Sequence, residues 1–313
     1  MPSLIMLKNL LAHSFGLKIP MQQHHAVAVH HFRYNQQMIT SPVMNETARL
    51  ATWNVNSLKA RRDHVLSYLS EGKADILLLQ ELKLQDADFP HDSFKEIGFS
   101  SVCHGQKTYN GVAIISRYDI DNVVRGLPDG DAPAGIDGEA DTHARYIQAD
   151  IKGLTVASLY LPNGNPCPGP KFDYKLRWMK RLAGVAETLR RSERPVILGG
   201  DYNVIPQDVD CYDPQAWEGD ALWHPDSRTA FFALSHSGYT DALRSIHPSG
   251  EKFSFWDYQA GAWQKNNGIR IDHLMMSPEA ASRLCAADVD AAERGKERPS
   301  DHTPVYCDIR LPS

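Results

Sequence analysis

Residues 74–81 read ADILLLQE, and positions 76–79 form an unbroken apolar run that ends at Gln80 and Glu81. A run without polar alternation is typical of a strand whose two faces are both covered. The stretch therefore predicts a buried strand inside a layered fold, with a carboxylate placed directly at its end.

Short apolar segments recur on both sides of this run. Those that read as strands are RLATWN (residues 49–54), GVAIIS (111–116), RYIQAD (145–150), LTVASLY (154–160), PVILGGD (195–201), IRIDHLMM (269–276) and TPVYCDIRL (303–311). Helical spacing appears from about residue 57, with Leu58, Val65 and Leu69 on one face, and again over residues 172–189. Many strands with few helices between them favour an α/β protein of two packed sheets flanked by helices over a doubly wound parallel sheet.

The composition is that of an ordinary globular protein, with 313 residues, 42% of them hydrophobic and 23% charged. No apolar run approaches the roughly 20 residues that span a bilayer, which predicts a soluble protein without a membrane partner. The five cysteines are odd in number and form no CxxC pair, so neither a disulfide framework nor a zinc site is indicated. We expect a monomer in a reducing, cytoplasmic compartment.

The net charge of −5 differs from the basic balance of most nucleic-acid binders. An acidic protein can still act on phosphates when its carboxylates hold a divalent cation. The overall charge therefore does not separate nucleic-acid enzymes from other classes.

Residues 1–45 differ from the rest, because they carry Lys8, Lys18 and Arg33 but no acidic residue and show no clean apolar period. An acid-free start resembles an organelle transit peptide. The alternative is a segment upstream of the true initiator, Met44. In both cases we expect disorder over residues 1–45 and a single catalytic domain over residues 46–313.

Polar side chains recur where the predicted strands end. They are Asn54, Glu81, Tyr160, Asp201, Asn203, Asp272, Asp301 and His302. Taken singly, each fits a turn or a strand end. In a two-sheet fold, however, strand ends on one side converge on a cleft, and together these residues supply carboxylates, amides, a phenol and an imidazole.

This set of side chains suits phosphodiester hydrolysis. Hard oxygen ligands without cysteine favour Mg²⁺ or Mn²⁺ over zinc. Attack by water needs a base, positive charge on the phosphate oxygens and help for the leaving alkoxide. No GxxxxGK[ST], GxSxG or HExxH motif is present, which disfavours nucleotide-dependent, acyl-transfer and zincin chemistries. A catalytically silent DNA-binding module is the other alternative, but it has no use for so many carboxylates.

Seven ordered motifs resemble the exonuclease III family of abasic-site endonucleases, within the endonuclease–exonuclease–phosphatase superfamily. They are TWNVNSLKAR, LLLQELK, HGQKTYNGVAI, SLYLPNGN, LGGDYNVIP, FSFWDYQAGAWQKNNGIRIDHLMMS and PSDHTPV, and the resemblance runs from about Leu50 to the C-terminus. It implies a four-layer DNase I-like fold and a metal-dependent DNA repair nuclease. The implied substrates are double-stranded DNA with abasic sites, cut on their 5′ side, or with blocked 3′ ends, together with 3′→5′ exonuclease activity. The alternative is a phosphatase or phosphodiesterase of the superfamily that acts on another substrate.

The resemblance also implies a metal-binding role for several of these residues. Glu81 is the principal carboxylate, with Asn54 and Asp301 close to the ion. Asp201 corresponds to the residue that activates the attacking water, and Asn203 to the amide that orients it; both lie close enough to be metal ligands as well.

Other matched positions are implied to contact the phosphate. Tyr160 corresponds to the phenol beside the scissile group, and Asn163 to a nearby contact. His302 corresponds to the imidazole that binds a phosphate oxygen, and Asp272 holds it.

The remaining expected DNA contacts are less specific. Phe255 and Trp256 are candidate walls of the abasic-sugar pocket or ordinary core aromatics. Loop residues suited either to the DNA backbone or to solvent are Lys107, Lys265, Asn267 and Arg270. The chain departs from some relatives at Pro166, where they carry a DNA-inserting Arg, and at Ile269, where they carry a pocket aromatic.

Overall fold

The computed structural model describes residues 46–128 and 140–312. The disorder expected for residues 1–45 therefore concerns residues outside the described part of the chain. Within the described part, the strands form two six-stranded mixed sheets.

The first sheet has the order β11-β12-β1-β2-β4-β3. Its strands are β1 (Thr47–Asn54), β2 (Ile76–Gln80), β3 (Ser100–His104), β4 (Val112–Ser116), β11 (Leu284–Val289) and β12 (Val305–Arg310). β1 and β2 run parallel, and the other neighbours run antiparallel.

The second sheet has the order β5-β6-β7-β8-β10-β9. Its strands are β5 (Asp121–Arg125), β6 (Tyr146–Ile151), β7 (Leu154–Tyr160), β8 (Val196–Asp201), β9 (Thr240–Asp241) and β10 (Asp272–Met276). Here β7 and β8 form the parallel pair.

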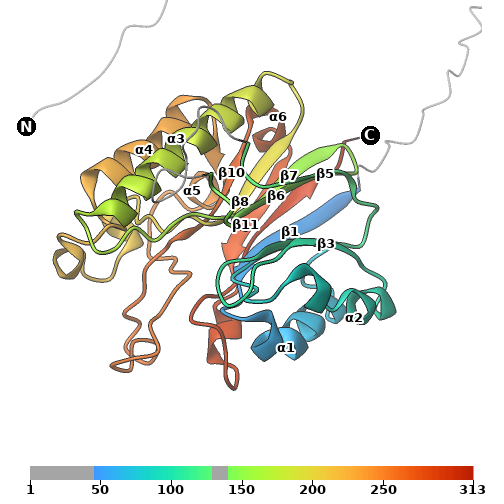
Figure 1. Ribbon diagram of the computed structural model, residues 1–313, viewed down its shortest axis with the longest axis horizontal. Coiled ribbons are helices and arrows are strands. Elements are labelled where there is room, and N and C mark those ends of the chain that lie inside the picture. The colour runs from blue at the N-terminus through green and yellow to red at the C-terminus, as the bar shows by residue number, and fades with distance from the viewer. Residues whose placement is uncertain (1–45, 129–139, 313) are drawn as a thin grey trace, which may run out of the picture. The chain divides into compact units, whose positions relative to one another are not determined.

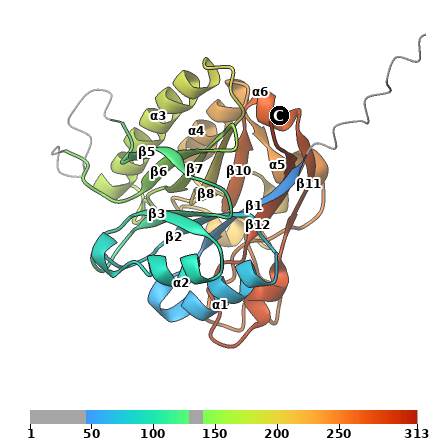
Figure 2. The same ribbon diagram turned by 90° about the vertical axis from the view of Figure 1, so that its right-hand side faces the viewer.

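Helices cover the outer faces of the two sheets on opposite sides, as both ribbon views show (Figures 1 and 2). Those of the first sheet are α1 (Leu58–Ser70) and α2 (His91–Glu96), and those of the second are α3 (Pro170–Arg190) and α4 (Pro225–His236). Two shorter helices, α5 (Ala242–Ile246) and α6 (Pro278–Ala281), follow. The layers are therefore helix, sheet, sheet, helix, which confirms the predicted fold class.

The burial of β2 explains its unbroken apolar sequence. Ile76 and Leu78 lie in the core between the sheets, together with Val156 and Ile197 of the second sheet. Leu77 and Leu79 point the other way and pack with residues of α1. Because successive side chains of a strand point to opposite faces, a strand covered on both faces needs apolar residues throughout.

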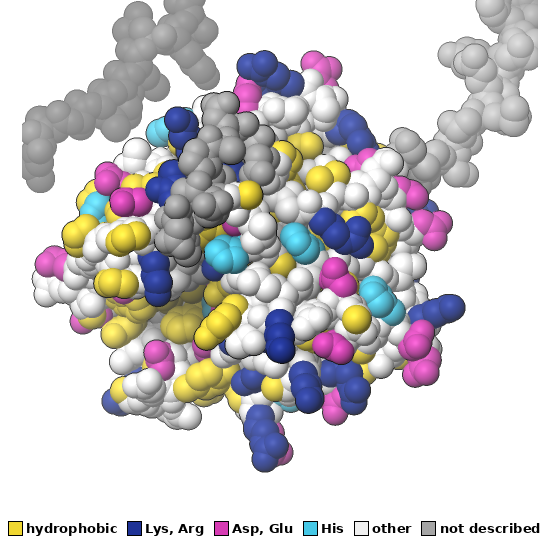
Figure 3. All heavy atoms as spheres, viewed as in Figure 1, with side chains coloured by type: hydrophobic (Ala, Val, Ile, Leu, Met, Phe, Trp, Pro, Cys, Tyr) yellow, Lys and Arg dark blue, Asp and Glu magenta, His cyan; other side chains and the backbone are white. Residues whose placement is uncertain are grey.

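The surface carries both signs of charge. Figure 3 shows Lys and Arg side chains scattered over one face, several of them in its lower part, where Figure 1 places α1. Among the described residues, no helix is both long enough and apolar enough to cross a membrane.

Candidate active site

Strand direction brings the predicted polar residues to one edge of the two sheets. β1 and β2 are parallel and end at Asn54 and Gln80, which are register partners, so Glu81 follows next to Asn54. β7 and β8 are parallel and end at Tyr160 and Asp201, which also pair. β10 runs antiparallel to β8, and its first residue, Asp272, lies opposite Asp201.

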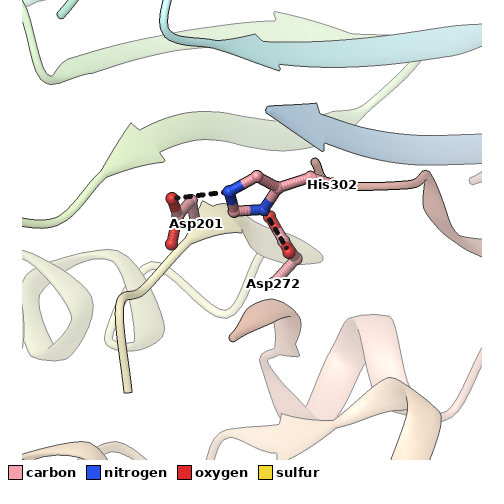
Figure 4. Close-up of side chains that lie close together, drawn as sticks. All are labelled: Asp201, Asp272 and His302. Carbon is pink, nitrogen blue, oxygen red and sulfur yellow. Dashed lines mark hydrogen bonds and ion pairs between the residues drawn. The ribbon is translucent and has the colours of Figure 1, made fainter. Parts of the chain in front are cut away.

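His302 lies between two carboxylates at the centre of this edge (Figure 4). Its Nδ1 is 2.8 Å from Oδ2 of Asp272, and its Nε2 is 3.8 Å from Oδ2 of Asp201. Ser254 donates its hydroxyl proton to the same Asp272 oxygen over 2.6 Å. The imidazole is thereby fixed in direction, with Nε2 turned toward the end of β8.

The electrostatics of this group favour a charged ring. Burial opposes the charge on His302, but the carboxylate of Asp272, through charge and hydrogen bond, raises its pKa to about 10. Burial also raises the pKa of Asp201, while the charge of His302 opposes that rise. A protonated imidazole beside a carboxylate that accepts protons readily is suited to binding and hydrolysing a phosphodiester.

Asn54 connects the two sheets within the site. Its Nδ2 donates to Oε1 of Glu81 and to Oδ2 of Asp201, each over 2.9 Å. Glu81 follows β2 with a φ of 52°, the left-handed conformation that costs a residue with a Cβ energy. Its carboxylate is thus held close to the end of β8 by one fixed amide.

A second set of contacts leads from Glu81 to Asp301. Lys83 Nζ is 2.9 Å from Oε2 of Glu81 and 2.5 Å from Oδ1 of Asn56. Asn56 in turn donates from Nδ2 to Oδ1 of Asp301 over 3.1 Å. Asn56 and Lys83 were not among the predicted site residues, although both lie in motifs that supplied Asn54 and Glu81, and their polar side chains beside those residues were the available signal.

Local contacts also perturb Glu81 and Tyr160. Burial of Glu81 favours its neutral form, but hydrogen bonds from Asn54 and Lys83 outweigh it, and the pKa of Glu81 is lowered. Burial, together with the charges of Glu81 and Asp201, raises the pKa of Tyr160 well above its usual value. Arg145 lies over the Tyr160 ring, 4.8 Å from its centroid. Tyr160 is therefore a neutral phenol that can donate its proton in a hydrogen bond.

Two amides complete the edge. Asn163, in the loop after β7, donates from Nδ2 to Oδ1 of Asn203 over 3.2 Å. Asn203 follows β8, donates its main-chain N–H to Oδ1 of Asp201 over 2.9 Å, and donates from Nδ2 to the carbonyl of Leu161. The two amides and Asp201 thus form one hydrogen-bonded group.

The donor set fits a hard cation best near Glu81. Asp201, Asp272 and His302 offer ligand atoms within 4.8 Å of one another, so distance alone allows a cation among them. A protonated imidazole has no lone pair for a metal, however, and His302 is held in that form by Asp272. Glu81 is an ionised carboxylate linked to Asp301 through Asn56 and Lys83, and oxygen ligands of this kind suit Mg²⁺.

The expected DNA contacts divide into exposed and buried residues. Phe255 is half-buried and meets the His302 ring edge-on, with centroids 4.9 Å apart. Lys265 is exposed and Asn267 half-buried in the loop before β10. Lys107 is exposed and lines a cavity of about 510 Å³ that also holds Lys83.

Two of the expected DNA contacts are wrong. Arg270 is 1% exposed, with Nε 2.6 Å from Asp210 and Nη1 2.7 Å from Asp241, so it is a buried ion-pair partner that cannot reach a DNA backbone. Trp256 is 3% exposed, packs against neighbouring aromatics, and donates its indole proton to Asn266. It is a core aromatic and not a pocket wall.

Comparison with known proteins identifies the family of the chain. The model of the Endonuclease/Exonuclease/phosphatase family matches residues 51–302. Exodeoxyribonuclease III of Haemophilus influenzae is 29% identical over 274 residues, which cover 84% of this chain and 100% of that protein.

Two solved structures are similar over most of the chain. One is a 3′ phosphatase, NExo from Neisseria, bound to a product DNA hairpin, with 38% identity, a TM-score of 0.78, and coverage of 84% of this chain and 99% of that one. The other is an AP endonuclease from Archaeoglobus fulgidus, with 33% identity, a TM-score of 0.78 and the same coverage of 84% and 99%. From its matched sequence, its fold and the residues gathered at one sheet edge, the chain belongs to the endonuclease/exonuclease/phosphatase family, and within it to the exodeoxyribonuclease III group of DNA repair nucleases.

Proposed function

We propose that this DNA repair nuclease hydrolyses the phosphodiester bond on the 5′ side of abasic sites in double-stranded DNA. We further propose that it removes nucleotides or blocking groups from 3′ ends, uses Mg²⁺ or Mn²⁺, and acts as a cytoplasmic monomer. The observation that carries the proposal is the continuous set of contacts from Glu81 through Asn54 and Asp201 to His302 and Asp272. The similarity to nucleases and to a DNA-bound 3′ phosphatase favours DNA over another phosphate ester as the substrate.

Glu81 and Asp301 are the residues that would hold the cation, with Asn54 close by. A bound Mg²⁺ supplies positive charge to the phosphate oxygens and to the leaving oxygen. Lys83 already places an ammonium between Glu81 and Asn56, which fits a local surplus of negative charge in need of a counter-charge.

Asp201 is proposed to accept the proton of the attacking water at Oδ2 or Oδ1. Burial raises its pKa, so its carboxylate is a stronger base than an exposed aspartate. Asn54 and the main-chain N–H of Asn203 bind this carboxylate and set its direction toward the phosphate.

The charge that develops on the phosphate is proposed to meet three donors. The protonated His302 offers Nε2–H, because Asp272 engages its Nδ1. Tyr160 offers a phenolic proton, and Asn163 lies near enough to Asn203 for its amide to face the same group. Fixed donors of this kind stabilise the transition state without having to reorganise during the reaction.

The test is a cleavage assay on labelled duplexes. One duplex carries a single tetrahydrofuran abasic analogue, one a 3′-phosphate, and one is intact; each is run with Mg²⁺, with Mn²⁺ and with EDTA. Incision at the analogue with either metal, and its absence with EDTA, is the expected result. Equal cutting of the intact and abasic duplexes would refute the abasic preference, and full activity in EDTA would refute the metal requirement.

A further inference from the structure

Lys175, on the inner face of α3, is a buried basic side chain beside the site. Its side chain is 0% exposed. In the described structure its hydrogen bonds go to main-chain carbonyl oxygens, from Nζ to Asn163 over 3.0 Å and to Asn203 over 2.6 Å. A buried ammonium is costly without compensation, so this placement needs a reason.

The two carbonyls belong to the two amides of the site. Asn163 lies in the loop after β7 and Asn203 in the loop after β8, and their side chains share the 3.2 Å hydrogen bond described above. Asn203 has a φ of 48°, a left-handed conformation that surrounding contacts must maintain. Lys175 therefore joins the backbones of two separate loops at the residues whose side chains meet.

The loop after β7 packs closely against the Lys175 side chain. A Cβ added at Gly164, where φ is +95°, would lie 2.7 Å from Cδ of Lys175 and 3.0 Å from Cβ of Ala221. The next residue, Asn165, is itself fixed, because it accepts from the main chain of Ala221 and donates to Asp220. The loop after β7 is thus held against the lysine stem as well as against its ammonium.

We propose that Lys175 is a positioning residue that sets the separation of the Asn163 and Asn203 amides at the scissile phosphate. The proposal rests on the nuclease function above. Burial lowers the pKa of Lys175 to about 7, but a neutral amine keeps two N–H donors for two carbonyls, so the contact itself does not depend on the charge. Losing it frees both loops and lets the amides move relative to Asp201.

Lys175→Met keeps the length and apolar stem of the side chain and removes the donors. A misplacement of about 1 Å in a catalytic group costs on the order of 100-fold in rate, so we expect kcat on the abasic duplex to fall roughly 10- to 100-fold. KM should change by less than about threefold, because the loops that contact the rest of the duplex are elsewhere.

A mutant cycle with a variant that lacks both amides, Asn163→Ala/Asn203→Ala, separates positioning from a general loss of stability. If Lys175 acts through these two amides, adding Lys175→Met to that variant should lower kcat by less than about twofold further. Met179→Ala is the matched control, since Met179 is buried on the same helix but packs in the core beneath it. It should lower the melting temperature with little effect on kcat.

Additive losses in the cycle, or a similar fall in kcat for Met179→Ala, would overturn the positioning role. If Lys175→Met does not fold, Lys175→Gln is used. Its amide nitrogen lies about one bond short of the lysine Nζ and is expected to leave at least one of the two carbonyls without its donor, so a kcat equal to that of the wild type would likewise overturn the proposal. The wild type, assayed in parallel, separates a failure of the proposed function from a failure of the Lys175 proposal. An inactive wild type contradicts the nuclease function itself. An active wild type with a fully active variant contradicts only the role of Lys175.

Discussion

Replacing Asp272 with Asn tests the electrostatic design of the site most directly. In the wild type, the pKa of His302 is raised from 6.5 to about 10, against the opposing effect of burial. That rise corresponds to about 5 kcal/mol in favour of the charged ring. Asp272 is the largest of the groups that produce it, through a 2.8 Å contact with Nδ1.

In Asp272→Asn the ring remains buried but loses its main counter-charge, so we expect its pKa to fall toward 6.5 or below. A ring with a pKa of about 6.5 is only about 3% protonated at pH 8. If catalysis needs the protonated form, kcat of the variant at pH 8 should be about 30-fold below that of the wild type at the same pH, whose ring is still protonated. The alkaline limb of the wild type should have its midpoint at about pH 10.

The same perturbation has a stability signature. Because the folded pKa of His302 lies above its unfolded value, its contribution to stability is complete below about pH 6.5 and is lost as the pH rises toward 10. The free energy of unfolding in urea should therefore decline over this pH range in the wild type, and the decline should be smaller in Asp272→Asn.

The assay is kcat against pH from 5.5 to 9.5 on the abasic duplex, with the fold checked by circular dichroism at each pH. Asp308→Asn is the control, since Asp308 pairs with Arg49 near the surface of the first sheet. An alkaline limb that keeps its wild-type position in Asp272→Asn would refute the reasoning.

The remaining predictions concern the metal, a buried ion pair and the N-terminal residues. Glu81→Gln should raise the Mg²⁺ concentration for half-maximal activity at least 10-fold and weaken Mg²⁺ binding in calorimetry, with an unchanged melting curve; unchanged Mg²⁺ binding would exclude Glu81 as a ligand. Arg270→Met should destabilise the fold by about 3 kcal/mol in urea unfolding, because it removes the guanidinium shared by two buried carboxylates, Asp210 and Asp241. In Arg270→Met, the dependence of DNA-binding affinity on salt concentration should equal that of the wild type, whereas in Lys265→Met it should be shallower. The reverse pattern would show that Arg270 contacts the DNA. A chain that begins at Met44 should melt and cut like the full chain at near-physiological salt, because three Lys and Arg residues neutralise few phosphates; a severalfold lower turnover would show that residues 1–45 contribute to the activity.

The sequence predicted those features that depend on local patterns. The unbroken apolar run of residues 76–79 identifies β2 from the sequence alone, and the polar residues that follow the run include Glu81. The strands that the sequence did not predict, among them β3 and β5, have mixed or mostly exposed residues, because an edge strand needs few apolar side chains.

Features that depend on distant partners could not be predicted in this way. Arg270 reads as a basic loop residue until Asp210 and Asp241, far away in the sequence, are seen to surround it. Lys175 similarly reads as part of the basic face of a long helix, whereas the fold turns it inward onto the carbonyls of two loops. Burial of a charge is decided by tertiary partners, and no local period in a sequence records them.

The bonds of Asn54 have a mechanical consequence, because they join residues from the two different sheets. Asn54 ends a strand of the first sheet, Glu81 follows the end of another, and Asp201 ends a strand of the second sheet. The core between the sheets is mainly apolar packing, which is non-directional, and within it Ser158 of the second sheet accepts a hydrogen bond from Gln80 and donates one to the carbonyl of Leu79. The hydrogen bonds of Asn54 are directional, so the geometry of the site depends on how the two sheets are aligned. We expect mild denaturant that shifts this alignment to abolish the nuclease activity while most of the secondary structure remains.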